Sequence, residues 1–366
     1  MKVILTGGGT IGSVSPLLAV KEALEDKSDD LKFYWIGTKD GIEKDIVVKE
    51  NIHYIGISSG KLRRYFDWNN LLDPFRILAG FFQAYRIIKE IQPDIILSAG
   101  GFVSVPVIWA AWILGKKSII HQQDIRPGLA NLLTVRCASR VTVTFKKSLL
   151  DFPVNKAIQL GNPVRKSILD GDKARAIKRF GLELKLPTLL ILGGSLGADF
   201  INQLLANSIR RLFDDCQIIH LTGKGNSNKY FEDKLYGEKG DRYHQYEYLH
   251  EEMADAYAAA DLVVCRAGLS TLTEVAAWRK PAIIIPIPKH QQEENAKYFQ
   301  DKNAAIVLDQ NSTASDQFVS LVREIIRNRR ILSQLQVKLH KLFPENSSEL
   351  YVDLINHELS KNNKKK

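Results

Sequence analysis

Two segments of the chain share one pattern: a short apolar run, two or more glycines, a hydroxyl residue, an apolar residue and a further glycine. They read LTGGGTIGS at residues 5–13 and LILGGSLGA at residues 190–198, and a helical pattern follows each. Around both, short apolar runs alternate with helical stretches, which is typical of parallel sheets with crossover helices. This duplication predicts two Rossmann-like α/β halves rather than one long sheet. The length of 366 residues also fits about two domains.

The apolar runs place the domain boundary near residues 161–165. Before it we expect strands at KVILTG, KFYWIG, DIILSAG, SIIHQ, RVTVTF and AIQLG; after it, at TLLILGG, QIIHLTG, the RYHQYEYL region, DLVVCRAG, AIIIPI and AAIVLD. Residues 165–180 are expected to form a charged helical stretch. The predicted domains are 1–163 and 164–344, with a C-terminal helix at 345–360 that packs back on the first domain.

Composition narrows the class of protein. A chain with 45% hydrophobic and 25% charged residues is typical of folded soluble proteins. Its three cysteines have no short spacing that suggests a metal site or disulfides, and they fit a reducing compartment; a strand that begins at Lys2 predicts no signal peptide. Residues 95–115 carry no charge over about the length of a membrane span. Gly100, Gly101 and Pro106 divide them, which favours a buried strand followed by a buried helix.

The net charge of +10 allows nucleic acid, an anionic membrane or a phosphorylated substrate as partner. No RNA- or DNA-binding signature accompanies the charge, so we expect no nucleic acid partner.

The glycine loops are candidate phosphate sites, because helix N-termini present unpaired amides and partial positive charge. In the first loop Ser15 is a candidate N-cap with Pro16 at the first helical position. Residues 7–12 also match G-x-G-x-x-G, which raises a dinucleotide-dependent dehydrogenase as an alternative. Its ribose-binding acid is missing, because the second strand runs into Gly37 and Thr38. Either loop alone could be only a tight turn; a matched pair favours ligand binding.

Six motifs together make the pattern specific: GGGTIG, HQQDIRPGLAN, GNPVR, GGSLGA, CRAGLSTLTE and HQQEENA. In this order they resemble the bacterial peptidoglycan N-acetylglucosaminyltransferases of glycosyltransferase family 28. The resemblance implies the GT-B architecture, an α/β fold of two Rossmann-like domains facing across a cleft. It implies inverting transfer of N-acetylglucosamine from UDP-N-acetylglucosamine to undecaprenyl-pyrophosphoryl-N-acetylmuramyl-pentapeptide, without a cofactor, by a peripheral protein at the cytoplasmic face of the cell membrane. The first domain would take the acceptor and the second the donor.

The resemblance also implies donor-binding residues. Glu274 would accept hydrogen bonds from the ribose hydroxyls, and Arg165 and Ser195 would contact the donor. Gln292, or Gln291 beside it, fits the glutamine that holds the sugar hydroxyls. Outside these motifs, Glu274 would fit the first turn of a helix and the glutamines an exposed surface. The other implied residues are Thr10, Ile11, Gly12, Asp124, Leu249, Leu269, Ser270, Thr271, Leu272 and Thr273.

The chain departs from the family at the presumed chemical centre. Where the family has a histidine at the end of the first loop, this chain has Ser13, and Ile11 replaces a glycine. The family's H-E-Q-N motif is here His121-Gln122-Gln123-Asp124. Inverting transfer needs a base for the acceptor hydroxyl, and we predict that Asp124 supplies it. Asp124 could equally anchor the turn that follows it.

Residues 61–89 combine cations with aromatic residues, a composition that suits an anionic membrane surface. We expect Ile77, Leu78 and Phe81 to pack on the sheet. Phe75, Phe82 and the pair Arg63 and Arg64 would lie nearer the lipid.

Two further functions stay open at this point. One is a related glycosyltransferase with another lipid or natural-product acceptor, which the departures at Ser13 and Gln122 favour. The other is a nucleotide-sugar-binding protein without catalysis. The histidines are scattered along the chain, so no metal site is predicted.

Overall fold

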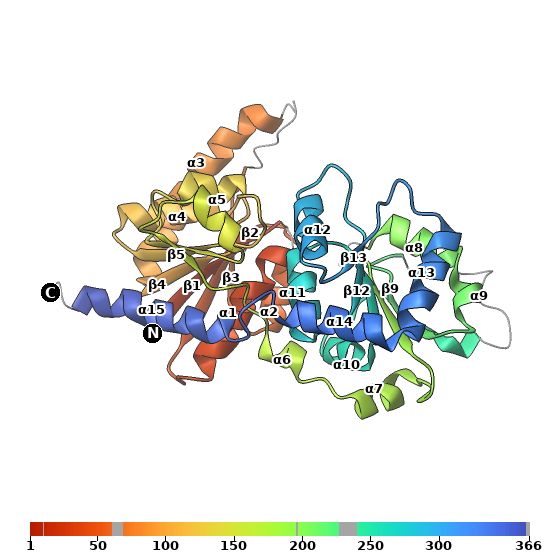
Figure 1. The fold of residues 1–366 in the computed structure, drawn as a ribbon. Coiled ribbons are helices and arrows are strands. Elements are labelled where there is room, and N and C mark those ends of the chain that lie inside the picture. Colours follow the sequence, from red (N-terminus) through yellow and green to blue (C-terminus); the bar gives the residue numbers. More distant parts are fainter. Residues whose placement is uncertain (10, 61–68, 195–196, 227–239, 364–366) are drawn as a thin grey trace. The chain divides into compact units, whose positions relative to one another are not determined.

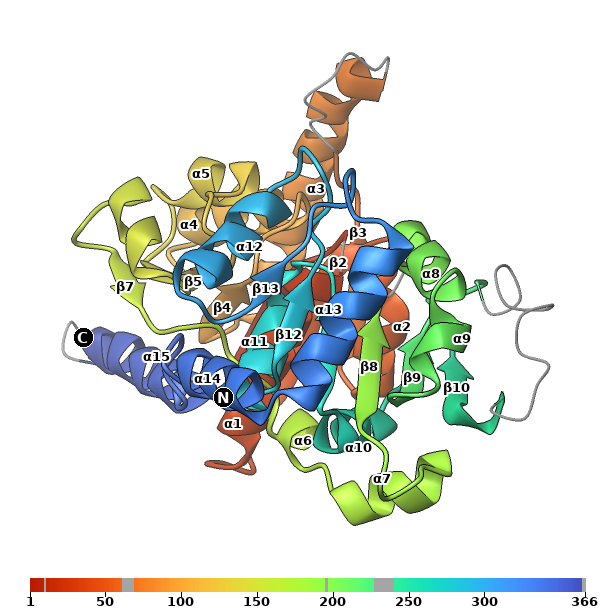
Figure 2. The ribbon, with the colours of Figure 1, turned by 45° about the vertical axis from the view of Figure 1, so that its right-hand side comes forward.

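The computed structural model of the protein describes residues 1–9, 11–60, 69–194, 197–226 and 240–363. It consists of two compact units (Figure 1). Unit 1 comprises Met1–Arg165 together with Asn346–Lys366, and unit 2 comprises Lys166–Glu345. Each unit contains one parallel sheet with helices packed on both faces (Figure 2), which confirms the predicted α/β fold class.

Unit 1 is built on a seven-stranded parallel sheet with the order β3-β2-β1-β4-β5-β6-β7. This order, with β1 inside and the chain reversing direction there, is that of a Rossmann fold. The strands are β1 (Lys2–Thr6), β2 (Lys32–Thr38), β3 (His53–Ile57), β4 (Ile95–Ser98), β5 (Lys117–Gln122), β6 (Arg140–Val143) and β7 (Ala157–Gln159). Strand β3 was not predicted, because its sequence HYIGI is not a continuous apolar run.

Alternating side chains of β1 enter two separate cores, one on each face of the sheet. Val3 and Leu5 belong to the core that α1 and α15 cover, whereas Ile4 belongs to the core that α3 and α4 cover. In α15, Tyr351 and Ile355 are buried in the first of these cores. The helical segments of unit 1 are η1 (Ile11–Ser13), α1 (Ser15–Glu25), α2 (Glu43–Lys49), α3 (Asn69–Ile91), α4 (Ser104–Ile113), α5 (Leu129–Thr134), η2 (Lys146–Asp151) and α15 (Ser347–Asn363).

The uncharged segment 95–115 forms strand β4 and helix α4, as its glycines and proline predict. No helix among the described residues is long and apolar enough to cross a membrane. The expectation that the whole helix is buried is wrong for its last turn. Trp112 is 59% exposed and Ile113 is 56% exposed.

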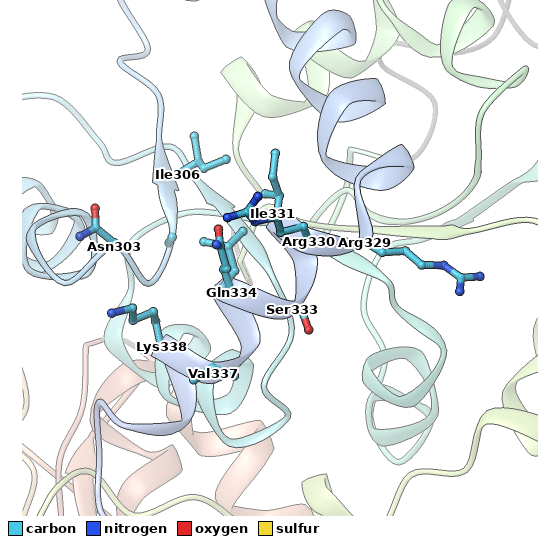
Figure 3. Close-up of a pocket in the computed structure, with 11 residues that line it drawn as sticks. Asn303, Ile306, Arg329, Arg330, Ile331, Ser333, Gln334, Val337 and Lys338 are labelled. Carbon is cyan, nitrogen blue, oxygen red and sulfur yellow. The ribbon is translucent and has the colours of Figure 1, made fainter.

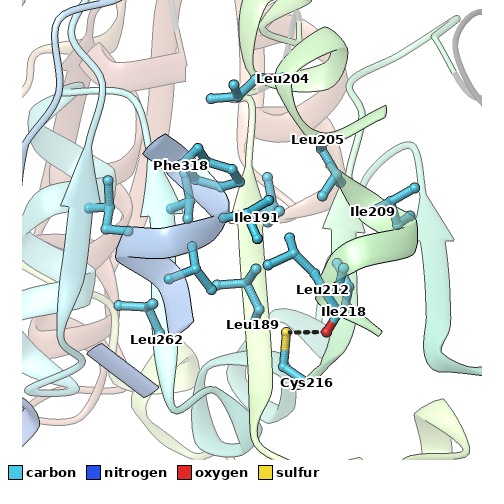
Figure 4. Packing of buried hydrophobic residues seen from close by; sticks show 14 of the residues in the cluster. Leu189, Ile191, Leu204, Leu205, Ile209, Leu212, Cys216, Ile218, Leu262 and Phe318 are labelled. Carbon is cyan, nitrogen blue, oxygen red and sulfur yellow. Dashed lines mark hydrogen bonds between the residues drawn. The ribbon is translucent and has the colours of Figure 1, made fainter. Parts of the chain in front are cut away.

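Unit 2 has a six-stranded parallel sheet with the order β10-β9-β8-β11-β12-β13. Its strands are β8 (Thr188–Leu192), β9 (Gln217–Leu221), β10 (Tyr243–Tyr246), β11 (Leu262–Cys265), β12 (Ala282–Ile284) and β13 (Ile306–Val307). Every strand predicted after the boundary is present. On one face of the sheet, Leu189, Ile191, Leu262 and Phe318 pack together in a fully apolar core (Figure 4).

The helices of unit 2 include a break that the sequence did not predict. The expected helical stretch at 165–180 is two helices, separated at Gly171. Gly171 lies so close to α10 (Glu252–Ala259) that a Cβ there would be 2.0 Å from the Ala254 carbonyl oxygen. Asp172 then caps the second helix by accepting a 2.6 Å hydrogen bond from the Arg175 amide. The helical segments are α6 (Lys166–Leu169), α7 (Lys173–Phe180), α8 (Asp199–Ala206), α9 (Ile209–Leu212), η3 (Gly240–Arg242), α10 (Glu252–Ala259), α11 (Leu269–Ala277), α12 (Gln292–Asp301), α13 (Ser315–Arg327) and α14 (Arg329–His340).

Candidate active site

The first glycine loop joins β1 to η1 and α1 in unit 1. Ser15 is not its N-cap: it is the first residue of α1, and the N-cap is Val14, whose carbonyl accepts 3.1 Å hydrogen bonds from the amides of Leu17 and Leu18. The prediction was one residue off because the turn η1 runs almost directly into the helix. Thr10 and the side chain of Ile11 lie outside the described residues.

Packing inside unit 1 accounts for two glycines of this loop. A Cβ on Gly7 would lie 2.7 Å from the Ser13 carbonyl oxygen, and one on Gly8 would lie 2.4 Å from the Glu43 carboxylate. Gly9 differs from both: its φ of +85° suits glycine, and a Cβ there would meet nothing within 4 Å. The loop therefore needs its first two glycines for its own fold, and only the third leaves open space beside it.

Glu43, which the sequence analysis did not single out, lies under this loop. Its carboxylate is fully buried and accepts hydrogen bonds from the Gly9 amide (3.2 Å), the Thr38 amide (2.9 Å) and the Thr38 hydroxyl (2.6 Å). Burial raises the pKa of Glu43, but the hydrogen bonds from Thr38 and Gly9 outweigh it and hold the pKa below its ordinary value. In the sequence, Glu43 looks like an ordinary acid in the first turn of a helix.

The side-chain amide of Gln122, which stands where the family's H-E-Q-N motif has a glutamate, holds the segment after β5. Gln122 is buried, and its Nε2 donates to the carbonyls of Asp124 (2.8 Å) and Arg126 (2.9 Å). Its Oε1 accepts from the Gly128 amide (3.2 Å) and from Asn131 Nδ2 (2.8 Å). An ionised carboxylate could not donate to the two carbonyls, so here the amide suits the turn that holds Asp124. Asp124 itself is half-buried.

Gln123 connects this segment to the first glycine loop. Its Nε2 donates a 2.8 Å hydrogen bond to the Gly12 carbonyl. The loop after β1 and the loop after β5 therefore meet at the carboxyl edge of the sheet, as the topology of a parallel sheet favours. This contact places Asp124 one residue from a side chain that touches the glycine loop.

Arg165 is the last residue of unit 1 before the chain enters unit 2. Its guanidinium Nη1 lies 3.4 Å from Glu50 Oε1, and its buried Nε has no hydrogen-bond partner among the described residues. An arginine held by one long contact retains donors that suit a phosphate.

In unit 2 the second glycine loop joins β8 to α8. Gly194 and Gly197 have φ angles of +80° and +78°, which favour glycine. A Cβ on Gly193 would lie 2.8 Å from the Ala198 amide nitrogen, and one on Gly197 would lie 2.3 Å from the Thr222 carbonyl oxygen. As in the first loop, a single glycine, here Gly194, faces open space. Ser195 lies outside the described residues.

Glu274 lies in the second turn of α11, not in the first turn that a purely dipolar role would require. Its Oε2 accepts a 2.9 Å hydrogen bond from the hydroxyl of buried Tyr257. Ser270 and Thr271 are half-buried on the same side of the helix, one turn away. Leu269, Leu272 and Thr273 are buried, so these three could meet a ligand only through their backbone.

The loop after β12 brings the predicted glutamines close to α11. Gln292 is half-buried and its Oε1 accepts from the Ile287 amide at 3.2 Å, whereas Gln291 is exposed. Arg266, which sequence reasoning missed, donates to the carbonyls of Ile285 (3.0 Å) and Pro286 (3.3 Å) and so holds this loop. Asn295 likewise donates to the Ala267 carbonyl at 3.2 Å. Arg266 lies in the motif CRAGLSTLTE and Asn295 in the motif HQQEENA, so the motifs contained both of these loop-holding residues.

Three loops therefore meet at one edge of the sheet of unit 2. They follow β8, β11 and β12, and β11 pairs with each of the other two strands. The carboxyl edge of a parallel sheet is where α/β folds bind nucleotides. Leu249 is buried in the segment between β10 and α10, near the same edge. A separate groove between β13 and α14, lined by residues such as Asn303, Arg330 and Lys338, contains none of the predicted site residues (Figure 3).

Comparison with known proteins finds relatives of both units. Residues 3–143 match the glycosyltransferase family 28 N-terminal domain, and residues 188–348 match the family's C-terminal domain. The chain is 38% identical, over 97% of both chains, to a UDP-N-acetylglucosamine–N-acetylmuramyl-(pentapeptide) pyrophosphoryl-undecaprenol N-acetylglucosamine transferase of Clostridium botulinum. It is 40% identical to one such transferase of Bacillus anthracis, over 89% of this chain and 92% of the relative.

The fold is likewise similar to a crystal structure of Acinetobacter baumannii MurG, with a TM-score of 0.73, 28% identity and coverage of 97% of this chain and 99% of that one. These matches run through both glycine loops and leave no place for the dehydrogenase alternative. The chain belongs to glycosyltransferase family 28.

Proposed function

We propose that the protein transfers N-acetylglucosamine from UDP-N-acetylglucosamine to undecaprenyl-pyrophosphoryl-N-acetylmuramyl-pentapeptide, a step of peptidoglycan synthesis. The observation that carries the proposal is the match of both domains, at 38% identity over 97% of the chain, to a relative named for this reaction. The site supports it, because a nucleotide-sugar needs both a diol acceptor and a phosphate site. The carboxyl edge of unit 2 offers Glu274 for the first and helix N-termini for the second.

In this proposal the donor binds to unit 2. The Glu274 carboxylate accepts hydrogen bonds from the ribose, and Gln292 or Gln291 holds the sugar hydroxyls. The N-terminus of α11, with Arg165 and Ser195, stabilises the charge that develops on the departing UDP. The remaining donor contacts come from the first glycine loop (Thr10, Ile11, Gly12), from Asp124 and Leu249, and from the start of α11 (Leu269, Ser270, Thr271, Leu272, Thr273).

The transfer assay tests the function directly. Purified protein is supplied with UDP-N-acetylglucosamine and the lipid-linked muramyl-pentapeptide, and the disaccharide lipid is the expected product. Transfer only to other acceptors would favour the related glycosyltransferase instead. UDP-N-acetylglucosamine binding without any turnover would favour the binding protein.

Asp124 is proposed as the base that takes the acceptor hydroxyl's proton. It follows β5 in unit 1, and its neighbour Gln123 holds the Gly12 carbonyl. Asp124→Asn removes the basic oxygen with little change in shape, so turnover should fall by about two to four orders of magnitude. Binding of UDP-N-acetylglucosamine should fall far less. Asp151→Asn, an exposed acid of the same unit, is the control; turnover equal in both variants would assign the base elsewhere.

The protein is further proposed to bind the cytoplasmic face of an anionic membrane, where an undecaprenyl acceptor is embedded. Helices α3, α4 and α5 pack in succession on unit 1. Together they expose seven large apolar side chains, named here the apolar ridge: Phe75, Leu78, Phe82, Trp112, Ile113, Leu132 and Leu133. Exposed cations accompany them at Arg76, Arg86, Lys89 and Arg136. Such a combination suits an interface without spanning it.

A further inference from the structure

Three of the hydrogen bonds of the described residues fasten the first glycine loop to the rest of unit 1. Trp35 Nε1 donates to the Gly7 carbonyl at 3.1 Å, and Gln123 Nε2 donates to the Gly12 carbonyl at 2.8 Å. Between them, the Gly9 amide donates to Glu43 Oε2 at 3.2 Å. The hydrogen bonds to Gly7 and Gly12 join neutral groups, whereas the Gly9 amide donates to the buried carboxylate of Glu43.

The surroundings of Glu43 are shaped for a carboxylate. The other oxygen, Oε1, accepts from the amide and the hydroxyl of Thr38, at the end of β2, and lies 3.3 Å from the Tyr54 hydroxyl. Two glycines leave room for it, because a Cβ on Gly8 would be 2.4 Å from Oε1 and one on Gly41 would be 2.1 Å from Oε2. Placing an anion at this depth is unfavourable unless its hydrogen bonds are satisfied, and these donors satisfy it.

Because of this arrangement, the Gly9 amide points inward to Glu43. It is therefore used by the protein itself, and the loop's conformation at its third glycine depends on the charge of one side chain from the next βα connection. The same loop is the part of unit 1 that contacts the Gln123 segment, whose next residue is the proposed base Asp124.

We propose that Glu43 is a positioning residue for sugar transfer: its buried carboxylate sets the backbone of the first glycine loop at the acceptor. This inference rests on the proposed function. Glu43 touches neither substrate; it acts through the Gly9 amide. Loss of its charge displaces the loop, and displacement of reacting groups by about 1 Å can cost about a hundredfold in rate.

Glu43→Gln is the central test. The amide keeps the shape, but its NH₂ group must face at least one N–H donor of Gly9 or Thr38, so the loop shifts. We expect kcat for the lipid acceptor to fall about 10- to 100-fold. The affinity for UDP, measured by calorimetry, should change by a smaller factor, because the proposed ribose contact of Glu274 and the N-terminus of α11 lie in unit 2. Gly8→Ala places a Cβ against the Glu43 carboxylate and so displaces the loop without removing the charge; it should reproduce this kcat loss.

Glu358→Gln is the matched control. Glu358 is also a buried acid of unit 1, bonded to Arg140 Nε at 2.8 Å and Lys361 Nζ at 3.2 Å, and none of these residues belongs to the loop. Both glutamine variants should lower the melting temperature, but only Glu43→Gln should lower kcat at a temperature where both are folded. Equal kcat values in the two variants, or an unaffected Gly8→Ala, would overturn the proposal. A wild-type protein that makes no disaccharide lipid would instead contradict the proposed function.

Discussion

Glu43 and Glu274 show how far one residue type can differ in role within a chain. Both lie in helices that follow a strand, and both are partnered by a tyrosine hydroxyl. Glu43 is fully buried and bonded to backbone amides, whereas Glu274 is half-buried with Ser270 and Thr271 beside it. Tyr257 donates to the Glu274 carboxylate from the buried side of the helix. This difference in exposure separates a positioning acid from a binding acid.

Glu274→Gln should therefore weaken UDP binding. A glutamine offers one acceptor oxygen in place of two, and hydrogen bonds to a charged group contribute about 1.5–3 kcal/mol. The dissociation constant for UDP, measured by calorimetry, should rise about 10- to 100-fold. Glu324→Gln, an exposed acid on α13 of the same unit, should leave it unchanged. Equal affinity in both variants would show that Glu274 does not hold the ribose.

At the scale of elements, helix α3 departs most from its sequence pattern. We expected Leu78 to pack on the sheet, but it is 54% exposed, whereas Ile77 and Phe81 are half-buried as expected. Apart from Asp73, the buried positions among the described side chains of the helix lie from Gly80 onward, because the N-terminal part of α3 extends beyond α4 (Figure 1). Phe75, Leu78 and Phe82 therefore form an exposed stripe. The basic pair Arg63 and Arg64 lies outside the described residues.

The apolar ridge should bind anionic vesicles. Replacing Phe75, Phe82 and Trp112 together by serine removes three large side chains from the ridge, each of which contributes about 1.5–3 kcal/mol when fully buried. Co-sedimentation with vesicles that contain phosphatidylglycerol should fall about tenfold or more. Val48→Ser is the control, since Val48 is 53% exposed on α2, a helix whose Val47 belongs to the core on the opposite face of the sheet. Binding that is equal in both variants, or independent of anionic lipid, would contradict a membrane role for the ridge.

At the scale of the whole molecule, each sheet contains a buried histidine near the carboxyl end of a strand. In unit 1, His121 lies between Thr142 Oγ1 (3.0 Å) and Asn162 Oδ1 (2.9 Å); in unit 2, His220 lies between the Tyr243 hydroxyl (2.8 Å) and Asn202 Oδ1 (3.0 Å). Burial lowers the pKa of His121 to about 4 and that of His220 to about 3. Both histidines are therefore neutral in the folded protein at neutral pH.

The two histidines should make stability depend on pH. Their pKa in the unfolded chain is about 6.5, so between that value and the lower folded pKa the unfolded state binds more protons. The contribution of these two histidines to the free energy of unfolding should be constant above about pH 6.5 and should fall, as pH decreases toward 4, by about 1.4 kcal/mol per unit for each histidine. Glu43, Asp255 and Glu358, whose pKa values are also lowered, add to the loss only in the more acid range where carboxylates protonate.

Urea unfolding at pH 7, 6, 5.5 and 5 measures this dependence. His220→Gln, which retains hydrogen-bonding groups but cannot titrate, should flatten the curve by its share. A free energy of unfolding that is constant from pH 7 to pH 5 would contradict the buried neutral state of both histidines.

The sequence by itself determined the local and repeated features of this protein: two α/β halves, parallel strands opened by matched glycine loops, and a strand and helix in place of a membrane span. Patterns of apolar residues and glycines within about twenty residues predict each of these features. The order of the six motifs along the chain indicated the family. Only the tertiary structure showed which residues distant in the sequence contact one another. The Gly9 amide meets Glu43 34 residues away, Gln123 meets Gly12 111 residues away, and α15 joins unit 1 through Arg140 and Glu358, 218 residues apart. Such pairs depend on which strands become neighbours, and no local pattern records that order.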